Sequence, residues 1–182
     1  MYTVFTPPLA LPVTLATAKA HLRVDHDEED ALINLMISGA TDYVQNEISG
    51  SLITQTIEEV YTHSARSYRL NRPKAIEVVS LYYVPPESNK FDSMYSIDNL
   101  MISSGQGSSL ILLDAAPVVN TKVADKVRIR YKSGYGNTSE DVPSALRMAI
   151  LIQLAEMYEH RQVRVRRHNT TVNDLIRDYK YM

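Results

Sequence analysis

The sequence predicts an α+β protein in which N- and C-terminal helices form a helical bundle and an antiparallel β region is inserted between them. Apolar residues recur with a helical period near residues 14–49 and again near 143–160. Between residues 52 and 132 the period changes to the alternation that is typical of strands. A glycine-containing segment, 133–137, then leads back into helix. The predicted divisions are N-terminal bundle helices at 1–51, a β-rich insert at 52–136, and a C-terminal bundle helix with a tail at 137–182.

Length and composition limit the class of protein. A chain of 182 residues fits one domain with an elaboration and can bury a core. The formal charge of −2 gives no overall attraction to nucleic acid or anionic membranes. The absence of cysteine excludes disulfides and thiolate metal sites and fits a reducing compartment. We find no signal peptide and no apolar run approaching the ~18 residues of a membrane span, so we expect a soluble protein without a membrane partner.

The first helical block contains two predicted helices. Thr14 is placed to cap a short helix, and a longer one is predicted from Asp27 to Ser49. Asp27 can cap the longer helix, and Gly50 follows it where glycine ends many helices. The acidic run 25–30 is also rich in oxygen ligands for a metal, but its spacing is not that of a calcium loop. Capping and the helix dipole explain the run.

The longer helix has a wider apolar arc than one packing partner requires. One stripe is made of Ile33, Met36, Ile37, Ala40, Val44 and Ile48. Leu32, Leu35 and Tyr43 widen this stripe well beyond the ~100° of a single buried face. Two interpretations remain open: the additional width packs between copies of the chain, or the middle of the chain covers it.

The insert contains several predicted strands, at 54–61, 76–84, 95–102, 110–113 and 127–132. The last is the clearest, because apolar and basic residues alternate strictly and place Arg128, Arg130 and Lys132 on one face. That face could follow the phosphates of DNA. Alternatively, it is a solvated face whose charges discourage pairing between strands of different molecules.

The C-terminal helix is predicted to begin near Pro143, which suits the first turn. From Ala145 to Tyr158 nearly every position is apolar or small. A helix that is apolar almost all round is enclosed, either by its own chain or by neighbouring subunits. We therefore add Met157 and Tyr158 to Leu32, Leu35 and Tyr43 as candidate subunit-interface residues.

Four segments in order resemble the head–tail connector proteins of long-tailed bacteriophages and prophages, also called adaptor or head-completion proteins. The segments are 15–33, 131–136, 142–161 and 172–180. They include the opening Leu-Ala-Thr-Ala-Lys-Ala-His-Leu-Arg, the exit Tyr-Lys-Ser-Gly-Tyr-Gly after the last strand, and the aromatic-basic close of the chain. The long β insert resembles a longer subgroup of that family.

The resemblance implies a structural virion protein rather than an enzyme. Family members form a ring, of about twelve copies, with closed rotational symmetry between the portal and a stopper or tail-completion protein. Double-stranded DNA passes non-specifically through the ring. The implied location is the head–tail junction of the virion, with the host cytoplasm before assembly. No cofactor is implied.

The C-terminal tail is the segment that we expect to dock on the portal. Its candidate docking residues are Arg164, Arg166, Arg167, Leu175, Ile176, Tyr179 and Tyr181. The alternative is a frayed, solvated tail. If the tail docks, deleting residues 169–182 is expected to abolish portal binding and to leave the melting temperature unchanged.

The sequence leaves two other functions open. One is another joint of the virion, such as a tail-completion protein. The other is a small metal-dependent enzyme, because the chain has five histidines and many carboxylates. Nothing in the sequence is spaced like a nucleophile elbow, a zinc-binding helix or a nucleotide loop, so we name no catalytic or metal-binding residue.

Overall fold

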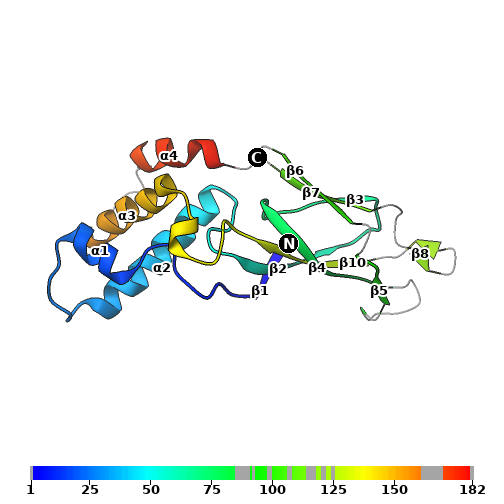
Figure 1. The fold of residues 1–182 in the computed structure, drawn as a ribbon, viewed down its shortest axis with the longest axis horizontal. Helices are drawn as coiled ribbons and strands as arrows, with labels where there is room; N and C mark the ends of the chain where they lie inside the picture. The colour runs from blue at the N-terminus through cyan, green and yellow to red at the C-terminus, as the bar shows by residue number, and fades with distance from the viewer. Residues whose placement is uncertain are drawn as a thin grey trace. The chain divides into compact units, whose positions relative to one another are not determined.

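The computed structural model confirms the α+β class, with helices from both ends of the chain and antiparallel sheets between them in sequence (Figure 1). It describes residues 2–84, 91, 93–97, 100–105, 108–113, 118–119, 122–123, 126–160 and 170–180. Contacts divide these residues into two compact units. The helical unit is drawn from residues 9–53 and 135–180, and the β unit from 2–8 and 54–134.

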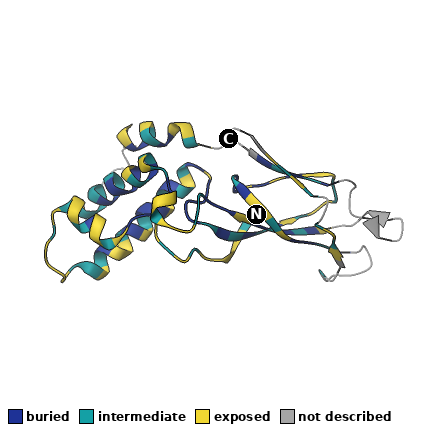
Figure 2. Cartoon of the chain, viewed as in Figure 1, coloured by how far each residue is buried: buried dark blue, intermediate teal, exposed yellow. Residues whose placement is uncertain are grey.

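The helical unit is built around one long helix. Its elements are α1 (Leu15–Leu22), α2 (Asp30–Glu47), the 3₁₀ turn η1 (Ser139–Asp141), α3 (Ser144–Glu159), α4 (Thr170–Ile176) and the 3₁₀ turn η2 (Arg177–Tyr179). Helices α1, α2 and α4 all pack against α3. Figure 2, which colours the ribbon by burial, shows buried and exposed residues alternating along the helices. No described helix has both the length and the apolar character needed to cross a membrane.

The helix ends follow local hydrogen bonding. Thr14 is confirmed as the first cap, because the Thr17 N–H donates to its Oγ1 at 3.2 Å. The prediction that Asp27 begins the long helix is wrong, since α2 starts at Asp30. Asp27 instead accepts a hydrogen bond from Lys19 Nζ at 2.5 Å. The Asp27 carboxylate therefore binds a lysine of α1 and does not cap α2.

The end of α2 lies one residue earlier than Gly50 predicts. Ser49 adopts the left-handed conformation, with φ of 53°, that we expected of the glycine. The Gly50 N–H donates to the carbonyl oxygen of Gln45 at 3.0 Å, which closes the last turn. Helix α2 therefore ends in a two-residue motif: Ser49 adopts the strained left-handed conformation, and Gly50 closes the last turn.

The β unit consists of two packed antiparallel sheets and a small hairpin. The five-stranded sheet has the order β1 (Tyr2–Thr6), β2 (Gln55–Tyr61), β10 (Lys126–Ser133), β4 (Ala75–Val84), β5 (Ser93–Tyr95). The three-stranded sheet has the order β3 (Ser67–Arg69), β7 (Ser108–Leu112), β6 (Met101–Gly105), and β8 (Val118–Val119) pairs with β9 (Lys122–Val123). Ile57, Leu81 and Ile129 of the larger sheet share one buried cluster with Tyr68 and Ile111 of the smaller one.

The strand prediction differs from the structure in several places, and the short strands β3, β8 and β9 were not predicted. A single strand over 95–102 is wrong, because β5 ends at Tyr95 and β6 begins at Met101 in the other sheet. Strand β1 was not predicted, since residues 1–51 were assigned to the bundle helices. It pairs antiparallel with β2, with Tyr2 opposite Glu59. The N-terminal segment therefore contributes to both units.

Candidate assembly interface

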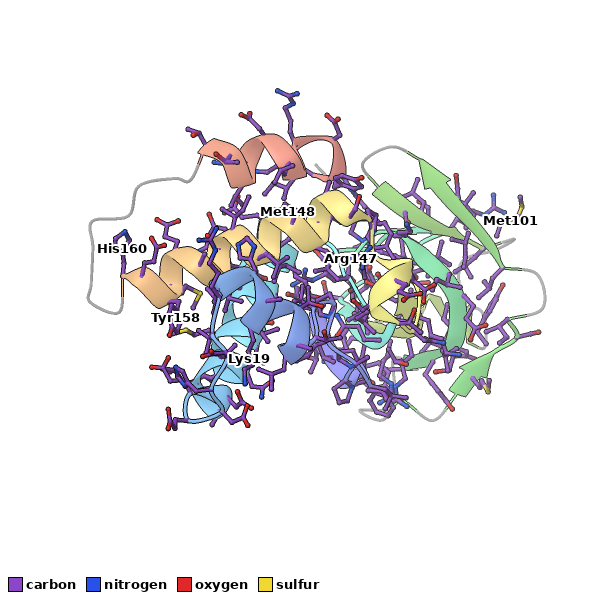
Figure 3. All side chains as sticks on the ribbon, turned by 60° about the vertical axis from the view of Figure 1, so that its left-hand side comes forward. Lys19, Met101, Arg147, Met148, Tyr158 and His160 are labelled. Atoms are coloured by element: carbon purple, nitrogen blue, oxygen red, sulfur yellow. The ribbon has the colours of Figure 1, made fainter. Side chains whose placement is uncertain are left out.

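Leu35 and Met148 are the large apolar residues that the two long helices leave exposed. Leu35 on α2 is 70% exposed. Met148 on α3, which is labelled in Figure 3, is 45% exposed. Leu32 and Tyr43 are half-buried, and Tyr43 packs against the core of the helical unit. Among the five predicted interface residues, Leu35 is thus the one whose side chain is mainly free of its own chain.

Met157 and Tyr158 lie within the helical unit's own packing. The methyl carbon of Met157 would be 3.2 Å from a Cβ built on Gly39, so it fills the space beside α2. The Tyr158 hydroxyl donates to a carboxylate oxygen of Glu29, at the start of α2. In the single chain these two residues join α3 to α2, and a substitution at either would disturb the fold as well as any interface.

Most of the wide apolar arc on the long helices is covered by other helices of the same unit. Helix α3, predicted to be enclosed, has α1, α2 and α4 around it, and Met148 is its exposed apolar residue between Ala145 and Tyr158. The additional apolar surface that we expected on the helices is therefore small. It is reduced to isolated side chains on their outer turns.

The acidic run before α2 is engaged by a lysine. Lys19 Nζ lies 2.5 Å from Asp27 Oδ1 and 2.8 Å from Asp30 Oδ1. Hydrogen bonding to Asp27 and Asp30 raises the pKa of Lys19, and the same bond lowers the pKa of Asp27. Within the residues that the structure describes, no three His, Asp or Glu side chains are grouped so as to hold a metal ion. The run holds the α1–α2 connection in place.

The described part of the C-terminal tail is folded into the helical unit. Val172 and Ile176 of α4 are fully buried in its core. Leu175 is half-buried, and the half-buried Tyr179 ring meets the edge of Tyr135 with the centroids 6.5 Å apart. Arg164, Arg166, Arg167 and Tyr181 lie outside the described residues.

This placement corrects two expectations. Ile176 is a core residue, so its side chain has no exposed surface to offer a portal. A deletion of 169–182 would also remove buried packing, and it cannot leave the melting temperature unchanged as we expected from the sequence.

The three cations of β10 lie on the outer face of the five-stranded sheet, and all three are paired. Arg130 Nε lies 2.7 Å from Glu58 Oε2, and Arg128 Nε lies 3.9 Å from the same oxygen. Lys132 Nζ lies 2.6 Å from Glu77 Oε1. Both carboxylates come from the strands on either side of β10. The cations outnumber the carboxylates, which leaves this small patch slightly positive.

Aromatic rings hold the two arginines against the sheet. The guanidinium carbon of Arg130 lies 3.7 Å from the centre of the Phe5 ring. That of Arg128 lies 4.6 Å from Phe91 and 5.0 Å from Tyr82. Such stacking fixes the guanidinium plane and reduces the entropy that a contact would cost. The patch suits weak, sequence-independent contacts with phosphates.

Sequence reasoning missed a buried carboxylate on the opposite face. Glu59 is 1% exposed and accepts hydrogen bonds from the hydroxyls of Tyr61 and Tyr131. It also accepts bonds from the backbone N–H of Asn71 at 2.9 Å and from its Nδ2 at 2.6 Å. Burial, and then the nearby Glu59 charge, raise the pKa of both tyrosines. The pair Glu58-Glu59 on an alternating strand was the available signal, because one of two consecutive residues must face inward.

Comparisons with known proteins agree with this architecture. The family model described as phage gp6-like head-tail connector protein matches residues 12–104. Among curated proteins, none matches the chain.

Three similar solved structures come from gene transfer agent particles. A chain of the native virion has a TM-score of 0.83 at 18% identity, and one from the empty-particle neck computed with C6 symmetry has 0.83 at 17%. A chain from the native-particle neck computed with C12 symmetry has 0.74 at 17%. Each alignment covers 100% of this chain and 96% of the other. At identities of 17–18%, the matches show that this chain shares its fold with each of the three solved chains along its whole length.

Proposed function

Because the chain belongs to the phage gp6-like head-tail connector proteins, we propose that it is a structural part of a virion neck and forms a ring there with copies of itself. The observation that carries this proposal is the family match, joined to a shared fold over the whole chain with proteins of particle necks. The role needs no chemistry, and we propose that the chain acts without catalysis at the head–tail junction after synthesis in the host cytoplasm.

The symmetry of the similar necks supports a ring. Those structures were computed with C6 and C12 symmetry. In a closed ring each subunit meets its neighbours through two different surfaces, which need not resemble each other. We propose about twelve copies, in keeping with the higher of the two symmetries.

We propose two partner proteins for the ring, a portal on one side and a stopper or tail-completion protein on the other. The basic segment with Arg164, Arg166, Arg167 and Tyr181 would dock on the portal, with Leu175 and Tyr179 beside it. Ile176 is excluded from this set because it is buried in the helical core. A stopper or tail-completion protein would bind on the opposite side of the ring.

We propose that DNA passing through the ring meets weakly attracting groups. Arg128, Arg130 and Lys132 are candidates, and their pairing with Glu58 and Glu77 supports that role. Partly neutralised cations attract phosphates without holding them tightly, as passage requires.

Leu35 offers the cleanest test of helix packing between copies. Leu35→Asp should reduce incorporation into particle necks at least ~10-fold, because burying a leucine contributes about 2 kcal/mol and an aspartate in its place must be desolvated. The matched control is Asn34→Asp, which introduces the same residue at the adjacent exposed position. The measurement is the amount of each variant in purified particles, normalised to a capsid protein.

Both variants should melt like the parent protein, since neither replaces a buried side chain. If Leu35→Asp and Asn34→Asp were incorporated equally, α2 would not be part of the subunit interface.

A further inference from the structure

The register of β10 gives two of its three outward cations an acidic residue as the opposite partner. Residues that lie opposite each other on paired antiparallel strands point to the same face of the sheet. Arg130 lies opposite Glu58 on β2, and the distance from its Nε to the carboxylate oxygen is 2.7 Å. Lys132 lies opposite Glu77 on β4, with Nζ 2.6 Å from the carboxylate oxygen. At such short distances the two charges of each pair largely cancel for a phosphate that approaches from solution.

The residues opposite Arg128 are uncharged. They are Val60 on β2 and Tyr82 on β4. Arg128 Nε lies 3.9 Å from Glu58 Oε2, which is too far for a hydrogen bond, and that oxygen already accepts one from Arg130 Nε. Among the residues that the structure describes, the buried Nε of Arg128 has no hydrogen-bond acceptor. Two arginines therefore share one negative charge, and Arg128 carries the surplus positive charge.

The guanidinium of Arg128 is held by aromatic rings instead of by an acid. Its carbon lies 4.6 Å from the ring centre of Phe91 and 5.0 Å from that of Tyr82. Stacking restricts the plane of the guanidinium but uses none of its N–H donors. The side chain is 22% exposed, so part of it is accessible from solution. A planar, charged group whose orientation is fixed in advance is well suited to bind a phosphate.

We infer that Arg128 is the residue of this face that binds the phosphates of DNA, and that Arg130 and Lys132 are ion pairs of the sheet. The inference rests on the proposed function, in which DNA passes through the ring, and it narrows three candidate cations to one. One contact in each subunit gives a weak attraction that is repeated around the ring and screened by salt. It reads no base sequence, because it involves only the DNA backbone.

The test is an NMR titration of the isotope-labelled full-length chain with a short DNA duplex at low salt. NMR measures weak binding and resolves the Nε–H groups of individual arginines, so one experiment gives both the affinity and the location of the contact. The Nε–H signal of Arg128 should shift as the duplex is added, and the shift should shrink as salt is raised.

Two substitutions should change the affinity for the duplex in opposite directions. Arg128→Gln should lower it roughly tenfold at ~50 mM salt, because one fewer phosphate is neutralised and one fewer counterion is released. Glu58→Gln should raise it by a similar factor, because Arg130 is then left with an unneutralised charge. The NMR spectrum of each variant also shows that it is folded.

Two controls separate this contact from the overall charge of the chain. Arg177→Gln removes the same charge from an exposed residue of the helical unit. The double variant Lys132→Gln/Glu77→Gln removes a whole ion pair from the same face and leaves the net charge unchanged. Both should bind the duplex within about twofold of the parent chain, since neither removes an unneutralised cation from the face.

Three results of the titration would overturn the inference. They are no binding of the duplex by the parent chain, equal losses for Arg128→Gln and Arg177→Gln, and no gain for Glu58→Gln. The connector function would survive each of them, because it is measured separately as the amount of the chain in particle necks. Arg128→Gln should enter necks in the parent amount, and exclusion of the folded variant would mean that Arg128 acts in assembly instead. If the parent chain is absent from particles, the proposed function fails and the inference fails with it.

Discussion

Replacing Ile176 by alanine should strongly destabilise the helical unit. Ile176 is fully buried where α4 joins the core that α2 and α3 form. Truncating a buried isoleucine to alanine costs about 2–5 kcal/mol, through lost transfer energy and the cavity that remains. For a chain of this size that corresponds to a fall of roughly 5–15 °C in melting temperature. Differential scanning calorimetry measures it directly.

The adjacent Arg177→Ala variant is the control. Arg177 is exposed and its ion pair with Asp178 is on the surface, so the substitution should change the free energy of unfolding by no more than about 0.5 kcal/mol. If Ile176→Ala and Arg177→Ala had the same melting temperature, α4 would not be packed against the helical core. That result would favour the interpretation of the tail as a free docking segment.

The second large effect is expected in the β unit, at Glu59. Glu59→Ala should cost about 2–4 kcal/mol, because it leaves the buried Tyr131 hydroxyl without its acceptor and removes the hydrogen bonds that Asn71 donates to the carboxylate. The half-buried Tyr61 hydroxyl loses the same carboxylate but keeps the Arg69 carbonyl oxygen as an acceptor. Urea unfolding monitored by tyrosine fluorescence would report it, since two of the affected groups are tyrosines.

Glu58→Ala is the matched control, one residue away on the outer face of the same strand. It breaks partly exposed pairs with Arg130 and Arg128, which are worth about 1 kcal/mol or less. The account of the β core predicts a clear gap between the two variants. Equal costs at the two positions would mean that Glu59 is not the buried acceptor of this network.

The regular elements could be predicted because their patterns are local. The helical period of Ile33, Ile37 and Val44 matches the buried face of α2. The alternation from Val127 to Lys132 matches β10, whose inward residues are buried in the β core. Thr14 was identified as a cap from its side chain and position, and its bond to Thr17 confirms it.

The features that could not be predicted from the sequence depend on contacts between residues that are distant along the chain. Strand β1 is short and followed by prolines, and it exists because β2 offers it an edge some fifty residues later. The pairing of Arg130 with Glu58 follows from the strand order, which alternation alone does not specify. The burial of Ile176 likewise requires α4 to fold back onto the core, which its seven residues do not reveal.

The least predictable feature was which apolar side chains are covered by the chain itself and which stay exposed. Periodicity located the wide arc on α2 and α3 but not the helices that would cover it. The same periodicity passed over Leu9 and Leu11, since residues in an irregular proline-rich segment have no period.

The most direct test of the connector role is the number and position of copies of this chain in purified particles. Quantitative mass spectrometry against a capsid protein of known copy number, with averaged images of the neck, would give both. We predict about twelve copies, all in one closed ring at the head–tail junction. A chain found singly, elsewhere in the particle, or not in it at all would contradict the account.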